Sequence, residues 1–255
     1  MNTPASLCTV AELTAFKRRL ARVDPILANV IRAAGKLTHT TSAQHSPFHA
    51  LARAIAHQQL NGIAAESIFG RFVGLYAVDG AGAAMLEAEM VLGTPDERLR
   101  AVGLSFAKIA SIKDLARKTL DGLVPPSEIL HTLGDDEIIE RITQVRGIGR
   151  WTVEMMLMSR LGRPDVLPVD DFGVRNGFRL AYGLRGMPTP RALAEFGARW
   201  APFRSVAAWY LWRAVDLHKA GKLPAPSQKT RIKIVKKKAK QKVATKKRAK
   251  PARKK

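Results

Sequence analysis

Two adjacent carboxylates are the first residues in this sequence that could do chemistry. Asp170 and Asp171 lie in the segment 167–175, which reads LPVDDFGVR. An Asp that begins a helix most often caps it, because its side chain accepts a hydrogen bond from a free backbone amide. A carboxylate can also stabilise a developing positive charge or take a proton from water. Taken alone the pair favours capping, so its meaning depends on its surroundings.

A turn with two glycines precedes this pair by about twenty residues. The segment 144–152 reads QVRGIGRWT and joins two stretches with helical periodicity. Gly147 can adopt a positive φ, and Gly149 allows another backbone to come close. A helix that begins at about Gly149 would direct its free amides and the positive end of its dipole outward, which suits a phosphate. An ordinary helix–helix turn is the alternative, and the basic character of the chain favours the phosphate site.

The charge of the chain predicts a polyanionic partner. The formal net charge of the 255 residues is +22. Residues 223–255 hold 15 Lys and Arg and no acidic residue, while residues 1–222 carry a net charge of +7. A tail of this composition, with Ala, Pro and Thr among the Lys residues, is expected to be disordered. It should bind any nucleic acid by counterion release.

Several classes of protein are excluded or disfavoured. Cys8 is the only cysteine, so the chain cannot form an internal disulfide or a four-cysteine zinc or iron–sulfur site. We find neither a signal-peptide pattern nor an apolar run of about 18 residues that could span a membrane. We therefore expect a monomer in the cytoplasm, associated with the nucleoid if the source is bacterial.

The elements that must position these residues are predicted to be helices. Apolar periodicity and start signals indicate an all-α body of roughly ten helices, and strand-like alternation is scarce. Asp24 is expected to cap one helix, and Thr94 to cap another that has Pro95 in its first turn. We predict that residues 1–222 form two helical subdomains with a cleft between them and that residues 223–255 form the disordered tail. The main predicted helices cover residues 10–20, 26–34, 47–56, 63–76, 106–120, 135–145, 151–161, 188–200 and 204–220.

In combination these features resemble the helix-hairpin-helix DNA glycosylase superfamily. The turn at 145–150 is similar to the family's hairpin, and an apolar-Pro-x-Asp-Asp segment follows it at the family's distance. The segments IAHQQL at 55–60, GLSFAK at 103–108 and WAPFRS at 200–205 resemble other parts of the pattern. The resemblance covers about residues 10–220. It is nearest to the 3-methyladenine DNA glycosylase II branch, in the compact form without an N-terminal β domain.

This resemblance implies a reaction and its central residue. The substrate would be double-stranded DNA with alkylated purines such as 3-methyladenine and 7-methylguanine, excised after base flipping. Asp171 would be the catalytic carboxylate, and Asp170 the cap that supports the turn. Members that also cut the DNA backbone carry a Lys at the position of Trp151, and that Lys forms a Schiff base. Trp151 cannot do so, which implies a monofunctional enzyme that leaves an abasic site.

The resemblance also implies roles for other residues. Trp151, Met155 and Trp212 would form the base pocket, although Trp212 could equally be a core residue. Gln59, with Leu60 beside it, would fill the space left by the flipped base, unless the two simply end a helix. DNA contacts are expected from Lys108, Gly147, Gly149, Arg150 and Thr152, although lone basic side chains are often merely solvated.

A cofactor is expected at most at the hairpin. In the family, hairpin carbonyls hold a monovalent cation, and the matching positions for Na⁺ or K⁺ are Thr143, Val145 and Ile148. No iron–sulfur cluster is expected.

Two other functions remain open from the sequence. A DNA-architectural protein without enzymatic activity would use the hairpin and the tail for binding, with Asp171 only a cap. A glycosylase for deaminated or oxidised bases would share the same fold. Met155 stands where the nearest members often carry an aromatic residue, which leaves the range of substrates open.

Overall fold

The computed structural model describes residues 7–39, 41, 45–77 and 86–225. Every regular element in these residues is a helix, which confirms the predicted all-α class. Thirteen α-helices and one short 3₁₀ helix occur in this part of the chain, more than the ten or so expected. The tail predicted to be disordered lies outside the described residues from position 226 onward.

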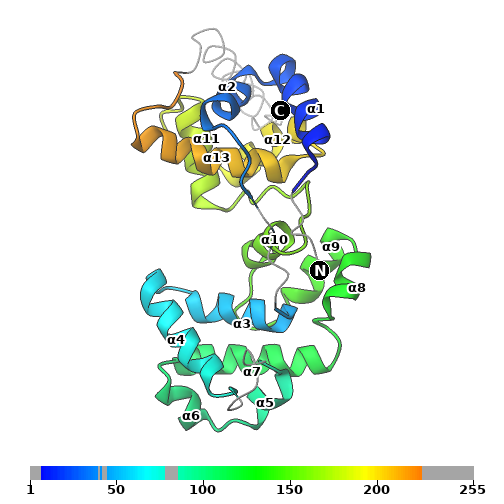
Figure 1. The fold of residues 1–255 in the computed structure, drawn as a ribbon, viewed down its shortest axis with the longest axis vertical. Coiled ribbons are helices and arrows are strands. Elements are labelled where there is room, and N and C mark those ends of the chain that lie inside the picture. The colour runs from blue at the N-terminus through cyan, green and yellow to red at the C-terminus, as the bar shows by residue number, and fades with distance from the viewer. Residues whose placement is uncertain (1–6, 40, 42–44, 78–85, 226–255) are drawn as a thin grey trace, which may run out of the picture. The chain divides into compact units, whose positions relative to one another are not determined.

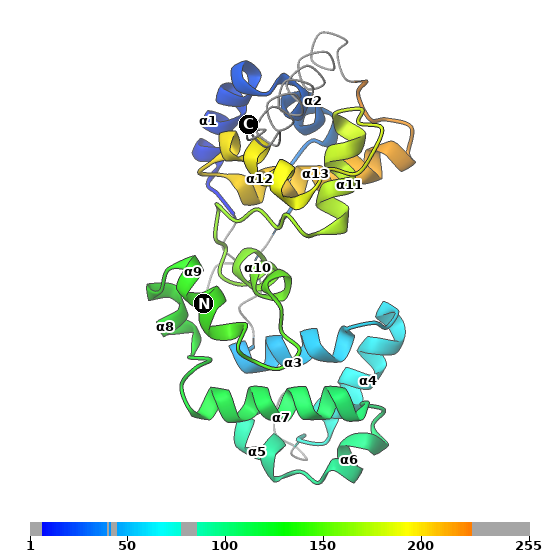
Figure 2. The ribbon, with the colours of Figure 1, turned by 180° about the vertical axis from the view of Figure 1, so that it is seen from behind.

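The described part of the chain forms two compact units, and the described residues of the first are 7, 39, 41, 45–77 and 86–166. In both views α7 lies between α3 on one side and α5 and α6 on the other (Figures 1 and 2). Leu51 and Ile55 of α3 and Ile112 and Leu115 of α7 are fully buried and form the core between these two helices. The helices of this unit are α3 (Pro47–His57), α4 (Gly62–Gly74), α5 (Ala88–Gly93), α6 (Asp96–Ala101), α7 (Phe106–Leu120), α8 (Ser127–Thr132), α9 (Asp135–Ile142) and α10 (Arg150–Ser159).

The described residues of the second unit are 8–38 and 167–225. A Cβ atom on Gly177 of α11 would lie 1.9 Å from the carbonyl oxygen of Leu211 in α13. Only glycine therefore allows these two helices to approach so closely. The helices of this unit are α1 (Val10–Val23), α2 (Pro25–Ala34), α11 (Phe172–Ala181), α12 (Pro190–Gly197), the 3₁₀ helix η1 (Ala198–Trp200) and α13 (Arg204–Lys219).

Asp24 caps α2, as predicted, and does more than the sequence indicates. Its Oδ1 accepts the Leu27 amide at 3.2 Å, while its Oδ2 accepts the Tyr182 hydroxyl at 2.5 Å and the Trp200 indole N–H at 2.7 Å. Asp24, Tyr182 and Trp200 are each at least 97% buried. Asp24 thus ties the N-terminal segment of this unit to its C-terminal helices.

The prediction that Thr94 caps a helix is wrong. Helix α6 begins at Asp96 with Pro95 at the N-cap position, and Thr94 instead ends α5. The Thr94 hydroxyl donates to the Met90 carbonyl and pairs with the Tyr76 hydroxyl at 3.0 Å. Helix α5 was not expected, because six residues are too short to show a helical period. Among the described residues, none of the helices has the length and apolar character needed to cross a membrane.

Candidate functional site

The predicted hairpin is present in the first unit. Helix α9 ends at Ile142, and α10 begins at Arg150 after a turn in which Gly147 has a φ of +77°. Gly149 is the N-cap residue of α10 and has no side-chain cap, and a Cβ atom there would meet nothing within 4 Å. The first amides of a helix have no carbonyl partner within it. The positive end of α10 therefore opens onto free space in front of Gly149, where a phosphate would fit.

The first turns of α10 carry Arg150 and Thr152, two of the predicted DNA contacts. The exposed Arg150 guanidinium pairs with the carboxylate of Glu154 at 2.9 Å, and the Glu154 side chain is only 4% exposed. Part of the Arg150 charge is thus balanced within the helix. Sequence reasoning missed Glu154, although its i,i+4 spacing from Arg150 is a recognisable signal. Thr152, also a predicted DNA contact, is half-buried in the first turn of the same helix.

The predicted wedge residues lie on a tight loop after α3. Gln59 has a φ of +57°, and it is the only non-glycine residue with a positive φ in the described part of the chain. Leu60 beside it is 41% exposed. The preceding residue, Gln58, donates from its side-chain amide to the Gly147 carbonyl at 2.8 Å. The loop that carries the predicted wedge residues is therefore bonded directly to the hairpin.

Lys108, a predicted DNA contact, directs its ammonium toward the end of α3. Its ammonium donates to the Ala56 carbonyl at 2.7 Å, in the last turn of α3. Burial of this group lowers the pKa of Lys108 below its ordinary value of 10.5. The side chain holds the end of α3, immediately before the wedge loop.

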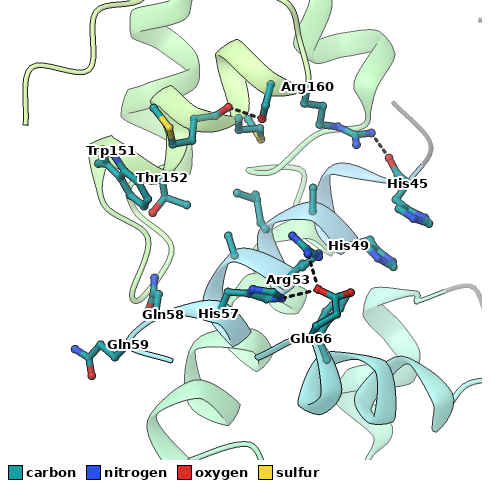
Figure 3. Close-up of a pocket in the computed structure, with 17 residues that line it drawn as sticks. His45, His49, Arg53, His57, Gln58, Gln59, Glu66, Trp151, Thr152 and Arg160 are labelled. Carbon is teal, nitrogen blue, oxygen red and sulfur yellow. Dashed lines mark hydrogen bonds and ion pairs between the residues drawn. The ribbon is translucent and has the colours of Figure 1, made fainter. Parts of the chain in front are cut away.

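A cavity of about 930 Å³ lies between α3, α4 and α10, and Figure 3 shows the side chains around it. Trp151 and Met155 of α10, two of the three residues predicted to form a base pocket, line this cavity, and Trp151 is 47% exposed. Arg53, His57 and Glu66 line it from α3 and α4. The Glu66 carboxylate pairs there with Arg53 at 2.5 Å and with His57 at 3.3 Å. The cavity therefore combines an aromatic surface with polar groups.

The acidic pair lies in the second unit, and the structure places the helix cap on the other carboxylate of the pair. Asp171, not Asp170, is the N-cap of α11, and its Oδ1 accepts the Val174 amide at 2.7 Å. Asp170 is exposed in the preceding turn, so the prediction that it caps the helix is wrong. The reason is register: α11 begins at Phe172, and only the residue directly before it can reach the third amide.

Trp212 is bonded to this carboxylate. Its indole N–H donates to Asp171 Oδ1 at 2.8 Å, across 41 residues of sequence. The ring also lies against Gly173, where a Cβ atom would be 2.7 Å from the indole Cδ1. Trp212 is half-buried, so part of its ring packs against the protein and part is accessible to solvent. Phe172, which follows Asp171 directly, is 70% exposed.

The predicted residues thus form two groups. The hairpin, the wedge loop, Trp151 and Met155 come together in the first unit, and Asp171 and Trp212 come together in the second. A carboxylate fixed by two donors at a helix start can stabilise positive charge or orient water. A cleft between the two units stays a prediction from the sequence.

Comparison with known proteins agrees with this geometry. Residues 52–202 match the family described as HhH-GPD superfamily base excision DNA repair protein, a segment that includes both the hairpin and Asp171. A DNA-3-methyladenine glycosylase 1 from Schizosaccharomyces pombe is 38% identical over 82% of this chain and 90% of its own length. The alkylbase DNA glycosidase-like protein mag2 of the same yeast is 27% identical over 80% of this chain and 95% of its own.

Solved structures show the same relationship. The S. pombe 3-methyladenine DNA glycosylase Mag1, in complex with abasic DNA, has a TM-score of 0.66 and 37% identity, covering 78% of this chain and 95% of its own. A DNA-3-methyladenine glycosidase from Bacillus halodurans has a TM-score of 0.73 and 32% identity, covering 86% and 95%. With its fold, its hairpin and more than half its length matched, this chain belongs to the HhH-GPD superfamily of base excision DNA repair proteins.

Proposed function

We propose that the protein is a monofunctional DNA glycosylase that removes alkylated purines, such as 3-methyladenine and 7-methylguanine, from double-stranded DNA. The observation that carries this proposal is Asp171, held by the Val174 amide and the Trp212 indole at the start of α11. The family and the names of the relatives support the same reaction, since one relative is called a DNA-3-methyladenine glycosylase and another a DNA-3-methyladenine glycosidase.

The chemistry follows from the charge of the substrate. Alkylation at N3 or N7 makes a purine cationic, so the glycosidic bond can break with its electron pair leaving on the base. Positive charge then develops on the sugar, and the Asp171 carboxylate stabilises it. The oxygen of a water molecule bonds to the sugar carbon, and the proton it releases passes to the carboxylate or to solvent. The products are the free base and an abasic site.

The first unit supplies the DNA-binding part of this proposal. The amides at the start of α10 bind a phosphate and fix the position of the protein on the duplex. Gln59 and Leu60 fill the space that the flipped base leaves. Trp151 offers its face to the electron-poor purine, with Met155 beside it in the cavity.

The same Trp151 restricts the reaction to base removal. An indole has no amine with which to form a Schiff base, so we propose that the enzyme does not cleave the backbone. Treatment of a reaction with borohydride should trap no covalent protein–DNA adduct. A trapped adduct, in which mass spectrometry finds a reduced Schiff base between a protein amine and the sugar, would contradict this part of the proposal.

A monovalent cation at the hairpin is compatible with the residues present. Carbonyl oxygens are ligands of hard cations, and the candidates are those of Thr143, Val145 and Ile148. The Val145 carbonyl accepts the Ile148 amide at 3.1 Å and, like any carbonyl, has a second lone pair. A bound cation would add positive charge next to a DNA phosphate. Replacing Na⁺ and K⁺ by tetramethylammonium at equal ionic strength should weaken duplex binding, and unchanged affinity would argue against the cation.

The activity is tested with methylated DNA. Incubation followed by alkali should produce strand breaks at alkylated purines, and a panel that includes hypoxanthine and oxidised guanine distinguishes glycosylases of other specificity. The variant Asp171→Asn keeps a capping side chain but loses the charge, so it should bind DNA and lose turnover.

Asp170→Asn is the matched control, with the same change one residue earlier at an exposed position. It should remain active. Full activity in Asp171→Asn would overturn the catalytic assignment. An intact protein that makes no abasic site across the panel would favour a purely architectural role.

A further inference from the structure

One face of α7 is bonded to the hairpin turn. The carboxylate of Asp114 accepts the backbone amide of Arg146 at 2.8 Å. The Lys118 ammonium donates both to Asp114, at 2.9 Å, and to the Gln144 carbonyl. The ion pair of Asp114 and Lys118 on α7 therefore binds two backbone groups of the turn, the Arg146 amide and the Gln144 carbonyl.

A third residue of α7 supports the turn by contact. A Cβ atom on Gly147 would lie 2.9 Å from the buried Ser111 hydroxyl oxygen, so the turn rests directly on this position. Ser111, Asp114 and Lys118 are spaced i, i+3 and i+7, which places them on one side of the helix. The hairpin is therefore seated along a continuous strip of α7.

This arrangement determines which way the amides of the turn point. The Arg146 amide is directed inward to Asp114, whereas the space in front of Gly149 is open. The bonds at Gln144 and Arg146 and the contact at Gly147 together restrict the turn, and only Ile148 and Gly149 then separate it from the first residue of α10. The orientation of the phosphate-binding amides at the start of α10 thus depends on Asp114.

Asp114 carries a negative charge close to the proposed phosphate site, and two cations lie next to it. Burial alone would raise the pKa of this carboxyl, but hydrogen bonds from the Arg146 amide and Lys118, with the charges of Lys118 and Arg117, lower it below 3.8. Asp114 is therefore a carboxylate at neutral pH. The two adjacent cations offset the repulsion that a bare carboxylate would exert on DNA.

We infer that Asp114, supported by Lys118, is a positioning residue that holds the hairpin in its phosphate-binding conformation. The inference rests on the proposed function only in taking the hairpin as the phosphate-binding element. It predicts that Asp114 affects DNA affinity through the hairpin amides and not through direct contact with DNA.

The first experiment measures the affinity of the full-length protein for a short undamaged duplex by fluorescence anisotropy. Asp114→Ala should weaken binding by about 5- to 10-fold, because the Arg146 amide loses its partner. Asp114→Asn retains an oxygen acceptor and should stay within about 2-fold of the wild type. Asp121→Ala removes the same charge from the exposed C-cap of the same helix and is the matched control, with unchanged affinity expected. Equal affinity in Asp114→Ala and the wild type would overturn the inference.

A double-mutant cycle distinguishes positioning from general destabilisation. Gly149→Ala places a methyl group in the open space in front of α10, where it meets no protein atom within 4 Å but would collide with a bound phosphate. If Asp114 acts through this site, Asp114→Ala should weaken binding little further in the Gly149→Ala background. Fully additive effects would overturn the inference while leaving the hairpin as the phosphate site.

The failure of the proposed function has a separate signature in the same cycle. If Gly149→Ala alone leaves the affinity unchanged, the hairpin does not bind phosphate and the premise itself falls. Should Asp114→Ala fail to fold, Lys118→Met gives the same cycle, because it removes the donor to Gln144 and leaves the Asp114–Arg146 bond in place. Additivity of Lys118→Met with Gly149→Ala would then count against the inference.

Discussion

At the scale of single residues, the bond between Trp212 and Asp171 is the most informative contact. Trp212→Phe keeps an aromatic ring but removes the N–H that donates to the carboxylate at 2.8 Å. A hydrogen bond to a charged group contributes about 1.5–3 kcal/mol. We expect the single-turnover excision rate to fall about tenfold or more while duplex affinity stays unchanged. Trp209→Phe, in the buried core of the same helix, is the control and should lower stability more than the excision rate. A wild-type rate in Trp212→Phe would show that this bond does not orient the carboxylate.

Gln59 gives a prediction in which stability and function change in opposite directions. A left-handed backbone costs a non-glycine residue about 1 kcal/mol or more, and Gln59 has a φ of +57°. Gln59→Gly relieves this strain at the cost of greater unfolded-state entropy. The free energy of unfolding in urea should therefore rise by up to about 1 kcal/mol, while excision from duplex DNA slows because the wedge is lost. Gln59→Asn adopts the same backbone and keeps an amide, so it should retain more activity. A variant that is both less stable and fully active would contradict this account.

At the scale of elements, the packing of α11 on α13 positions Asp171 and Trp212. Gly177→Ala places a methyl group 1.9 Å from the Leu211 carbonyl oxygen, so the two helices must move apart. Overpacking of this kind costs about 1–3 kcal/mol, and excision should fall because both functional side chains lie on these helices. Gly186→Ala is the control, since a Cβ atom there meets nothing within 4 Å. Thermal unfolding of both variants tests the prediction, and equal melting temperatures would show that the helices adjust without cost.

Helix α3 carries a pH-dependent contribution to stability at His49. Burial, the main cause, and the charges of His45, Arg160 and Arg53 together lower the pKa of His49 from 6.5 to about 4. The folded protein holds the neutral ring, whereas the unfolded chain takes up a proton near pH 6.5. The free energy of unfolding should therefore fall as the pH drops from about 6.5 to 4, by on the order of 1–2 kcal/mol after solvent screening. His49→Phe preserves the ring contacts with His45 and Phe69 and should lose this part of the pH dependence in urea titrations. An unchanged pH profile in the variant would exclude His49 as its source.

The sequence predicts elements better than it predicts contacts between them. Long amphipathic helices such as α7 and the cap at Asp24 are local features, and both are confirmed. The choice between Asp170 and Asp171 as the cap depended on a register of one residue, which periodicity does not resolve. The Trp212–Asp171 bond spans 41 residues and arises only when α11 packs on α13. The positive φ of Gln59 likewise has no local signal, because glutamine is not a residue that favours that conformation.

At the scale of the whole molecule, the proposed activity draws on both units. Phosphate binding, the wedge and Trp151 belong to the first unit, whereas the carboxylate belongs to the second. Variants of the hairpin should therefore change duplex affinity at every sequence, because phosphate contacts carry no base information. Variants at Asp171 should change the excision rate and leave that affinity intact.

The distribution of charge gives a prediction for the complete chain. Residues 223–255 carry 15 of the 43 Lys and Arg residues and no acidic residue, and each phosphate that such a tail neutralises releases counterions from DNA. Deletion of 223–255 should weaken binding to undamaged duplex and reduce the slope of log affinity against log salt. Single-turnover excision at saturating enzyme should remain close to that of the full chain, because the hairpin and Asp171 are retained. A tail of equal length with Gln in place of Lys and Arg should behave like the deletion, whereas a scrambled tail of the same composition should behave like the wild type. An unchanged salt slope would show that the tail does not contact DNA, and loss of single-turnover excision would show that it takes part in the reaction.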